Sequence, residues 1–165
     1  MTTNDILNEL RQETQATRIV LARVPQSKLD WKPHEHSMTL GQLAMHIASL
    51  PEAIANLSLQ PSFDVNFNIP RPGANSVEEI LALLDQSVSS AETLLGTMDD
   101  EALNLPWRMM QGDRELFAIP RAALLRSVML NHWYHHRGQL TVYLRLLDVP
   151  LPVIYGATAD EIPFQ

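Results

Sequence analysis

A segment near the C-terminal end of the chain, residues 121–147, repeats its apolar side chains with the period of an α-helix. Such spacing is typical of a helix with one buried face. One stripe takes every fourth residue: Leu124, Val128, His132, His136, Leu140 and Leu144. Four residues make about one helical turn, so we expect His132 and His136 to stand one above the other on the inward face. Two stacked imidazoles facing a core indicate a metal ion, because neutral imidazole is the commonest protein ligand for zinc, nickel or iron.

Three earlier segments also carry helical periodicity. The first runs from near the N-terminus to about Val24, where a proline follows. The second opens with the T-x-x-Q capping box of residues 39–42, and Pro51 either kinks or ends it. The third opens with another capping box at residues 76–79. The second helix places His46 on its apolar face, as a third inward histidine.

The connections between these segments are unequal. Residues 58–75 are rich in proline and lack periodicity, so we expect a long crossover connection that serves as a lid or a pocket wall. Residues 99–119 are irregular and can form a short hairpin, and the tail after residue 147 is non-helical. The predicted fold is all-α: a four-helix bundle with a long crossover connection and a short irregular insertion before the last helix. We expect residues 1–165 to form a single domain.

Charge and composition exclude several classes of protein. The formal net charge is −7, and the 12 basic residues are dispersed, which disfavours binding to nucleic acid. No apolar run approaches the length of a membrane span, and the N-terminus lacks the layout of a signal peptide. Cysteine is absent, so there is no thiolate ligand or cysteine nucleophile. These features are consistent with a cytoplasmic protein that binds neither nucleic acid nor membranes.

The three inward histidines favour a metal site over an ordinary core. A single histidine on an apolar face is more often a satisfied core residue, but burying three without partners costs on the order of a few kcal/mol. We therefore predict that His46, His132 and His136 bind a divalent metal ion, with zinc or nickel the expected metals. Three protein ligands leave a position for water, which is the layout of a catalytic site. Trp133 and Tyr134 occupy positions between His132 and His136, so the glutamate that serves H-E-x-x-H proteins as general base is missing and no general base is identified.

Four polar residues near the histidines have separate expected roles. Glu13 lies at the edge of the apolar stripe of the first helix and is expected to reach solvent, with a hydrogen bond to a buried histidine as the alternative. His135 lies toward the flank of the last helix, either behind a metal ligand or at the surface. Arg137 is expected to form an ion pair or to bind backbone carbonyls, and Gln139 to pack between helices.

Three motifs resemble those of DinB-type (DinB/YfiT-like) damage-inducible proteins. They are L-x-x-H-I-A around His46, N-H-W-Y-H-H-R-G-Q-L at residues 131–140, and the tail at residues 149–161. In that tail Ala157 and Thr158 replace the usual Pro-Ser. The likeness spans nearly the whole chain. It implies a four-helix bundle, often dimeric, whose three histidine ligands match His46, His132 and His136.

The resemblance also implies chemistry. Some relatives are metal-dependent transferases or isomerases that use low-molecular-weight thiols such as mycothiol or bacillithiol, and others are hydrolases. We therefore expect a metal-dependent enzyme of the thiol-dependent transferase or hydrolase type, acting on a small molecule. Two alternatives stay open: a metal-binding stress-response protein without turnover, and a structural dimeric bundle with three hydrogen-bonded core histidines. The sequence assigns no substrate and no catalytic residue beyond the ligands.

Overall fold

Four long helices form the body of the molecule. The structure is a computed structural model that describes residues 1–65 and 70–163. The helices are α1 (Thr3–Leu21), α2 (Leu40–Leu59), α3 (Val77–Leu95) and a last helix of three consecutive parts, α4 (Arg121–Leu124), η3 (Leu125–Asn131) and α5 (His132–Leu146). Short 3₁₀ turns, η1 (Gln26–Lys28) and η2 (Ala102–Asn104), lie in the connections. The predicted four-helix bundle is confirmed, whereas the single-domain assignment stays a prediction.

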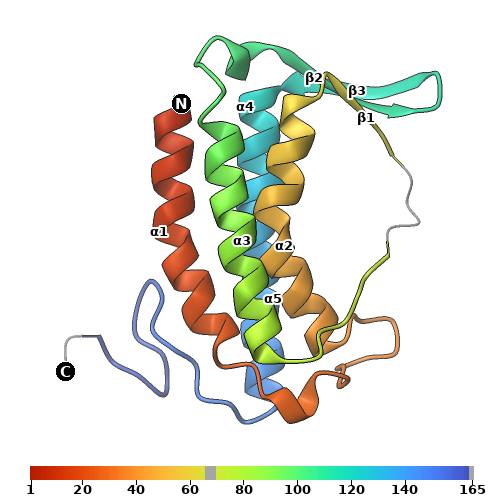
Figure 1. Cartoon of the computed structure of the whole chain (residues 1–165). Helices are drawn as coiled ribbons and strands as arrows, with labels where there is room; N and C mark the ends of the chain where they lie inside the picture. The colour runs from red at the N-terminus through yellow and green to blue at the C-terminus, as the bar shows by residue number, and fades with distance from the viewer. Residues whose placement is uncertain (66–69, 164–165) are drawn as a thin grey trace.

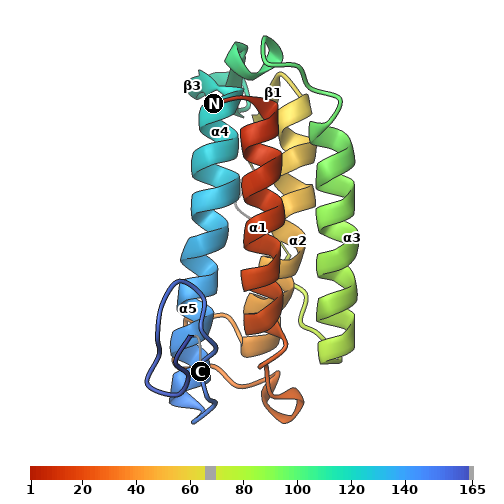
Figure 2. The same cartoon turned by 90° about the vertical axis from the view of Figure 1, so that its left-hand side faces the viewer.

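The chain does not alternate up and down through the bundle. Figure 1 shows that α1 and the last helix run one way while α2 and α3 run the other. Because α2 and α3 are neighbours that point in the same direction, the chain between them must return along the whole length of the bundle. The predicted crossover is therefore confirmed, although residues 66–69 lie outside the described residues. Turned by 90°, the molecule shows α1 beside the last helix (Figure 2).

A small sheet covers one end of the bundle, so the all-α prediction is wrong in detail. Its strands are β1 (Ser62–Asp64), β2 (Pro106–Gln111) and β3 (Arg114–Pro120), in the order β1-β2-β3. Strands β2 and β3 form the predicted hairpin, and Gly112 takes a φ of +57° in its two-residue turn. Strand β1 pairs parallel to β2 but is too short for its sequence to show a two-residue period.

The helix starts follow the capping residues closely. The Thr39 hydroxyl accepts from the Gln42 backbone N–H while the Gln42 side chain accepts from Thr39, which confirms that capping box. At α3 the Ser76 hydroxyl accepts from the Glu79 backbone N–H. The Glu79 carboxylate, however, accepts from the backbone N–H of Asn75, one residue earlier than a capping box requires. The second box is therefore only half formed.

Helix α2 continues through its internal proline. Pro51 has no N–H, so the carbonyl of Ile47 loses the bond that an α-helix would supply. The indole Nε1 of Trp133, on α5, donates to that carbonyl at 2.8 Å. The Ser87 hydroxyl, on α3, accepts from the backbone N–H of Glu52 at 3.0 Å. Two neighbouring helices therefore complete the hydrogen bonding of α2 where the proline interrupts it.

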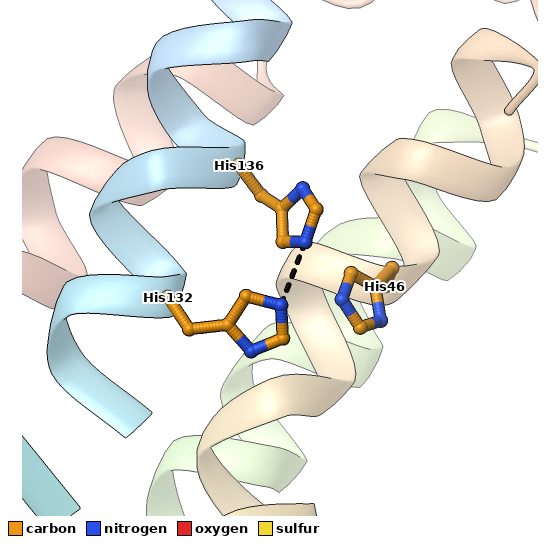
Figure 3. Close-up of side chains that lie close together, drawn as sticks. All are labelled: His46, His132 and His136. Atoms are coloured by element: carbon orange, nitrogen blue, oxygen red, sulfur yellow. Dashed lines mark hydrogen bonds between the residues drawn. The ribbon is translucent and has the colours of Figure 1, made fainter. Parts of the chain in front are cut away.

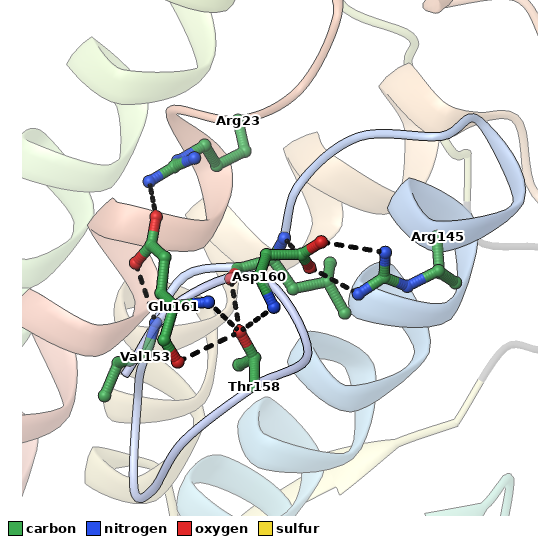
Figure 4. A network of polar contacts seen from close by, with 7 residues as sticks. Arg23, Arg145, Val153, Thr158, Asp160 and Glu161 are labelled. Atoms are coloured by element: carbon green, nitrogen blue, oxygen red, sulfur yellow. Dashed lines mark hydrogen bonds and ion pairs between the residues drawn. The ribbon is translucent and has the colours of Figure 1, made fainter. Parts of the chain in front are cut away.

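The tail after α5 is non-helical, as predicted, and is held by side chains. Figure 4 shows Thr158 at its centre, with its hydroxyl accepting from the backbone N–H groups of Asp160 and Glu161. Arg145 of α5 pairs with Asp160, and Arg23, just beyond α1, pairs with Glu161. A hydroxyl at position 158 is therefore what orders this turn, and threonine supplies it.

Candidate metal centre

Three histidines converge between α2 and α5. His46 lies on α2, and His132 and His136 lie on α5; one nitrogen from each ring is within 4.8 Å of the other two (Figure 3). The ring centroids are 5.3 Å apart for His46 and His132, 4.6 Å for His46 and His136, and 4.5 Å for the two α5 rings. The structure thus brings together the three residues that the sequence singled out, from positions 86 and 90 residues apart in the chain.

These rings are half-buried and do not face fully inward, because η3 is a π-helical segment. A π-helix needs more residues per turn, so the buried stripe advances by five residues there instead of four. The fully buried positions are Leu124, Leu125, Met129, Leu130, Trp133, Arg137, Leu140 and Leu144. The predicted stripe through Val128, His132 and His136 is therefore wrong by one position. The shift leaves both imidazoles at the margin of the core, where solvent reaches them.

The cluster disfavours positive charge on His46. Burial, together with smaller repulsive effects of His136, His132 and the guanidinium of Arg71, lowers the pKa of His46 to about 4. Arg71 lies near the end of the crossover connection, and its backbone carbonyl accepts from the side chain of Gln42, one turn before His46. At neutral pH the His46 ring is uncharged, so it has a lone pair available for a cation.

The two α5 rings have hydrogen bonds that orient them. His132 Nε2 and His136 Nε2 lie 2.8 Å apart, and His136 Nδ1 lies 2.7 Å from Gln139 Oε1. Because Gln139 Oε1 can only accept, His136 Nδ1 donates and the lone pair falls on Nε2, toward the cluster. Burial lowers the pKa of His132 and His136, against smaller raising effects of hydrogen bonds at Val128 and Gln139 respectively. His136 is therefore suited to coordination through Nε2. In the metal-free protein His132 Nε2 donates to it, so the proton on His132 must leave Nε2 before that atom can bind an ion.

The donor set fits a small divalent ion. In a tetrahedral zinc site, ligand nitrogens about 2.05 Å from the ion lie about 3.3 Å from one another. The 2.8 Å between His132 and His136 is slightly shorter than this, and the 4.8 Å limit for the whole group is longer. Among the described residues the group contains only histidines, so nitrogen ligands would hold the ion with no carboxylate.

Glu13 belongs to a different centre, and both predictions for it are wrong. Its carboxylate is buried and pairs with Arg137 at 2.7 Å, while the hydroxyl of Tyr155 donates to it at 2.5 Å. Arg137 also donates to the Thr17 hydroxyl at 3.2 Å. The predicted ion-pair role of Arg137 is confirmed. Sequence reasoning missed this because Tyr155 reaches Glu13 only when the tail folds back on α1.

Gln139 is the functional residue that sequence reasoning misplaced. It is exposed and hydrogen-bonded to His136, so its predicted packing between helices is wrong. Its position three residues after His136 was the available signal, since residues three apart are neighbours on a helix. His135 is exposed, and the centroid of its ring lies 5.1 Å from that of His136. This exposure agrees with the predicted surface role of His135. Arg71 had no sequence signal, because a loop brings it to the site.

The pocket wall expected at residues 58–75 stays a prediction. Arg71 shows that the end of this connection approaches the histidines, but residues 66–69 lie outside the described part of the chain. Two hollows lie elsewhere: one between α2 and α3 beside Asn56, and one between α1 and the tail beside Tyr155. Neither is lined by the three histidines. Within the described residues, no helix combines the length and apolarity needed to cross a membrane.

Fold and site together define a helical-bundle protein with a three-histidine cluster between two of its helices. The DinB family model matches residues 1–162, and the chain belongs to the DinB family. The chain is 25% identical over 168 residues to "uncharacterized protein YrdA" of Bacillus subtilis (strain 168), covering 97% of this chain and 92% of that protein. The resemblance drawn from the three motifs is therefore confirmed.

Solved structures show the same fold. A DinB-like protein from Bacillus cereus ATCC 10987 superposes with a TM-score of 0.72 at 23% identity, covering 93% of this chain and 98% of that one. YfiT from Bacillus subtilis superposes with a TM-score of 0.65 at 18% identity, covering 89% of this chain and 88% of that one. YfiT is described as a probable metal-dependent hydrolase with an unusual four-helix bundle topology.

Proposed function

We propose that this protein is a divalent-metal-dependent hydrolase of small molecules, with His46, His132 and His136 as its metal ligands. The observation that carries the proposal is the convergence of three uncharged, half-buried imidazoles from two helices, within 4.8 Å of one another. The similarity in fold to YfiT supports the hydrolytic class. Three ligands are typical of catalytic zinc sites, whereas structural sites have four.

A divalent ion held there would supply Lewis-acid chemistry, since it lowers the pKa of water and polarises a carbonyl or phosphoryl oxygen. We propose zinc or nickel, the borderline metals that imidazole suits. The exposure of the rings leaves room for a substrate to approach. Within the described residues no carboxylate joins the group, so no general base is assigned.

The protein's own residues would orient the ligands and shape the charge of the site. Gln139 holds His136 in the tautomer that presents Nε2. Burial keeps His46, His132 and His136 uncharged, so binding an ion near neutral pH requires little proton release. Arg71 adds positive potential beside His46, which favours substrates that carry or develop negative charge.

The test begins with elemental analysis of the untagged protein, beside a His46→Ala/His132→Ala/His136→Ala variant. A polyhistidine tag must be absent because it binds the same metals. Both proteins are then incubated with zinc or nickel and assayed with chromogenic esters, amides and phosphoesters. We expect near-stoichiometric metal and metal-dependent hydrolysis in the wild type, and neither in the variant.

The other outcomes separate the rival functions. Turnover only with an added low-molecular-weight thiol would identify a thiol-dependent transferase instead. Stoichiometric metal without turnover would favour a non-catalytic metal-binding protein. No metal in either protein would leave a structural bundle. The expected homodimer stays a prediction, which light scattering of the same preparations can test.

A further inference from the structure

A buried hydrogen bond joins the two helices that carry the histidines. The indole Nε1 of Trp133 donates to the backbone carbonyl of Ile47 at 2.8 Å, and the Trp133 side chain is 0% exposed. Trp133 directly follows His132, and Ile47 directly follows His46. The bond therefore ties together the two backbone segments from which His46 and His132 project.

The carbonyl of Ile47 is open to this bond because of a proline. In an α-helix it would accept from the N–H of residue 51, but Pro51 has none. A bond of 2.8 Å between the buried indole and this carbonyl limits the separation and the register of the two helices. Pro51 and Trp133 together therefore specify how α2 sits against α5 at the level of the cluster.

We propose that Trp133 is a positioning residue for the metal site, acting through the Ile47 carbonyl to set the distance of His46 from His132 and His136. The inference rests on the proposed function, since it presumes that the three histidines bind an ion. The role of Trp133 differs from that of Gln139, which orients only the ring of His136. Trp133 instead fixes the relative placement of the two helices that carry the ligands.

The chain contains its own matched control. Trp107 is 1% exposed, and its indole Nε1 donates to the carbonyl of Leu57 at 3.0 Å. That carbonyl also precedes a proline by four residues, Pro61, although the Gln60 backbone N–H reaches it as well at 3.2 Å. Leu57 lies eleven residues beyond His46 along α2, about 16 Å at the rise of a helix. Trp107 therefore makes a similar bond far from the histidines.

The experiment compares Trp133→Phe with Trp107→Phe, since each substitution removes the N–H donor and keeps a large ring. Zinc affinity is measured by competition with a chromophoric chelator, and the stability of the metal-free proteins by urea unfolding. We expect both variants to lose stability, with zinc affinity about tenfold weaker in Trp133→Phe and within about twofold of wild type in Trp107→Phe. The absorption spectrum of bound Co²⁺, which reports ligand geometry, should change only in Trp133→Phe.

A second variant separates positioning from stability. Adding Pro51→Ala to Trp133→Phe supplies an N–H to the Ile47 carbonyl from within α2, without restoring the bond to α5. We expect this double variant to regain stability but to keep the weakened zinc affinity and the altered Co²⁺ spectrum. Recovery of affinity together with stability would overturn the positioning role.

Zinc and Co²⁺ binding by the wild type distinguishes a failure of the proposed metal site from a failure of the positioning role of Trp133. If wild-type protein binds neither zinc nor Co²⁺, the proposed metal site fails and the inference fails with it. If wild type and Trp107→Phe bind zinc and Trp133→Phe binds it equally well with an unchanged Co²⁺ spectrum, only the positioning role of Trp133 is overturned.

Discussion

Helix α5 carries two polar centres on adjacent residues, and they are built in opposite ways. Toward α1, Arg137 is 3% exposed and meets the carboxylate of Glu13 and the hydroxyl of Thr17. Toward α2, the rings of His132 and His136 are half-buried and meet each other and His46, with no carboxylate in the group. The first centre joins opposite charges, and the second gathers groups of one kind.

The two centres of α5 therefore have different roles: the one at Arg137 stabilises the fold, and the histidine cluster is the candidate binding site. The centre at Arg137 satisfies its own charges, so it needs nothing from outside the chain. The histidine cluster points ring nitrogens toward one another, and a cation would take the place of the proton that His132 and His136 share. Its partial exposure lets an ion and a substrate reach it. A buried charged group that is already paired with an opposite charge, such as Arg137, is therefore weak evidence for a ligand-binding site. Several metal-ligating side chains of one kind that converge, such as the three histidines, are strong evidence.

The largest effect should come from breaking the centre at Arg137. Arg137→Met leaves the buried carboxylate of Glu13 without its counter-charge, so we expect a loss of about 3–5 kcal/mol in the free energy of unfolding of the metal-free protein. Urea unfolding measures it. The double variant Glu13→Leu/Arg137→Met removes both charges and should recover most of the loss. Equal destabilisation of the single and double variants would show that packing, and not the ion pair, is what matters.

Removing one metal ligand should act only when metal is present. Zinc at a hundredfold excess over its Kd stabilises a folded protein by about 2.7 kcal/mol, and His132→Ala should lose that increment. The measurement is thermal unfolding with and without zinc. His135→Ala, which changes the exposed neighbour, should keep the full increment. If His132→Ala is destabilised equally in both conditions, His132 serves the core instead of an ion.

A smaller effect is expected from the group behind His136. Gln139→Leu removes the acceptor for His136 Nδ1–H, and we expect zinc affinity to weaken about tenfold, or about 1.4 kcal/mol. Stability without metal should change by less than about 0.5 kcal/mol because Gln139 is exposed. Gln139→Glu retains an acceptor and should bind zinc at least as tightly as wild type. Unchanged affinity in Gln139→Leu would remove Gln139 from the site.

The smallest effect concerns pH. The pKa of His46 falls to about 4 in the folded protein, so the unfolded chain takes up a proton first as the pH drops below about 6.5. Stability is fully present above that value and is lost progressively down to about pH 4. Solvent screening of the half-buried ring limits the loss to about 1 kcal/mol. Urea unfolding of metal-free wild type and His46→Gln should show a shallower pH slope in the variant, and identical slopes would contradict the assignment.

Much of this site could be predicted from the sequence because its ligands sit on strongly periodic helices. His46 falls on the apolar face of α2, and His132 and His136 are one turn apart on the last helix. When these helices pack side by side in a bundle, His46 comes close to the other two histidines. Gln139 was within reach of the same reasoning. Trp133 was not, since its bond depends on a carbonyl that only the packed helices bring to it.

By itself the sequence determined the four helices, the capping box at Thr39 and Gln42 and the three histidines, because these depend on spacing and local chemistry along the chain. Tertiary structure decided the rest. The π-helical turn at Leu125–Asn131 moved both α5 histidines to the edge of the core, and the folded-back tail made Glu13 a partner of Arg137. Those outcomes depend on contacts between residues distant in the chain, and the periodicity of a single helix carries no information about them.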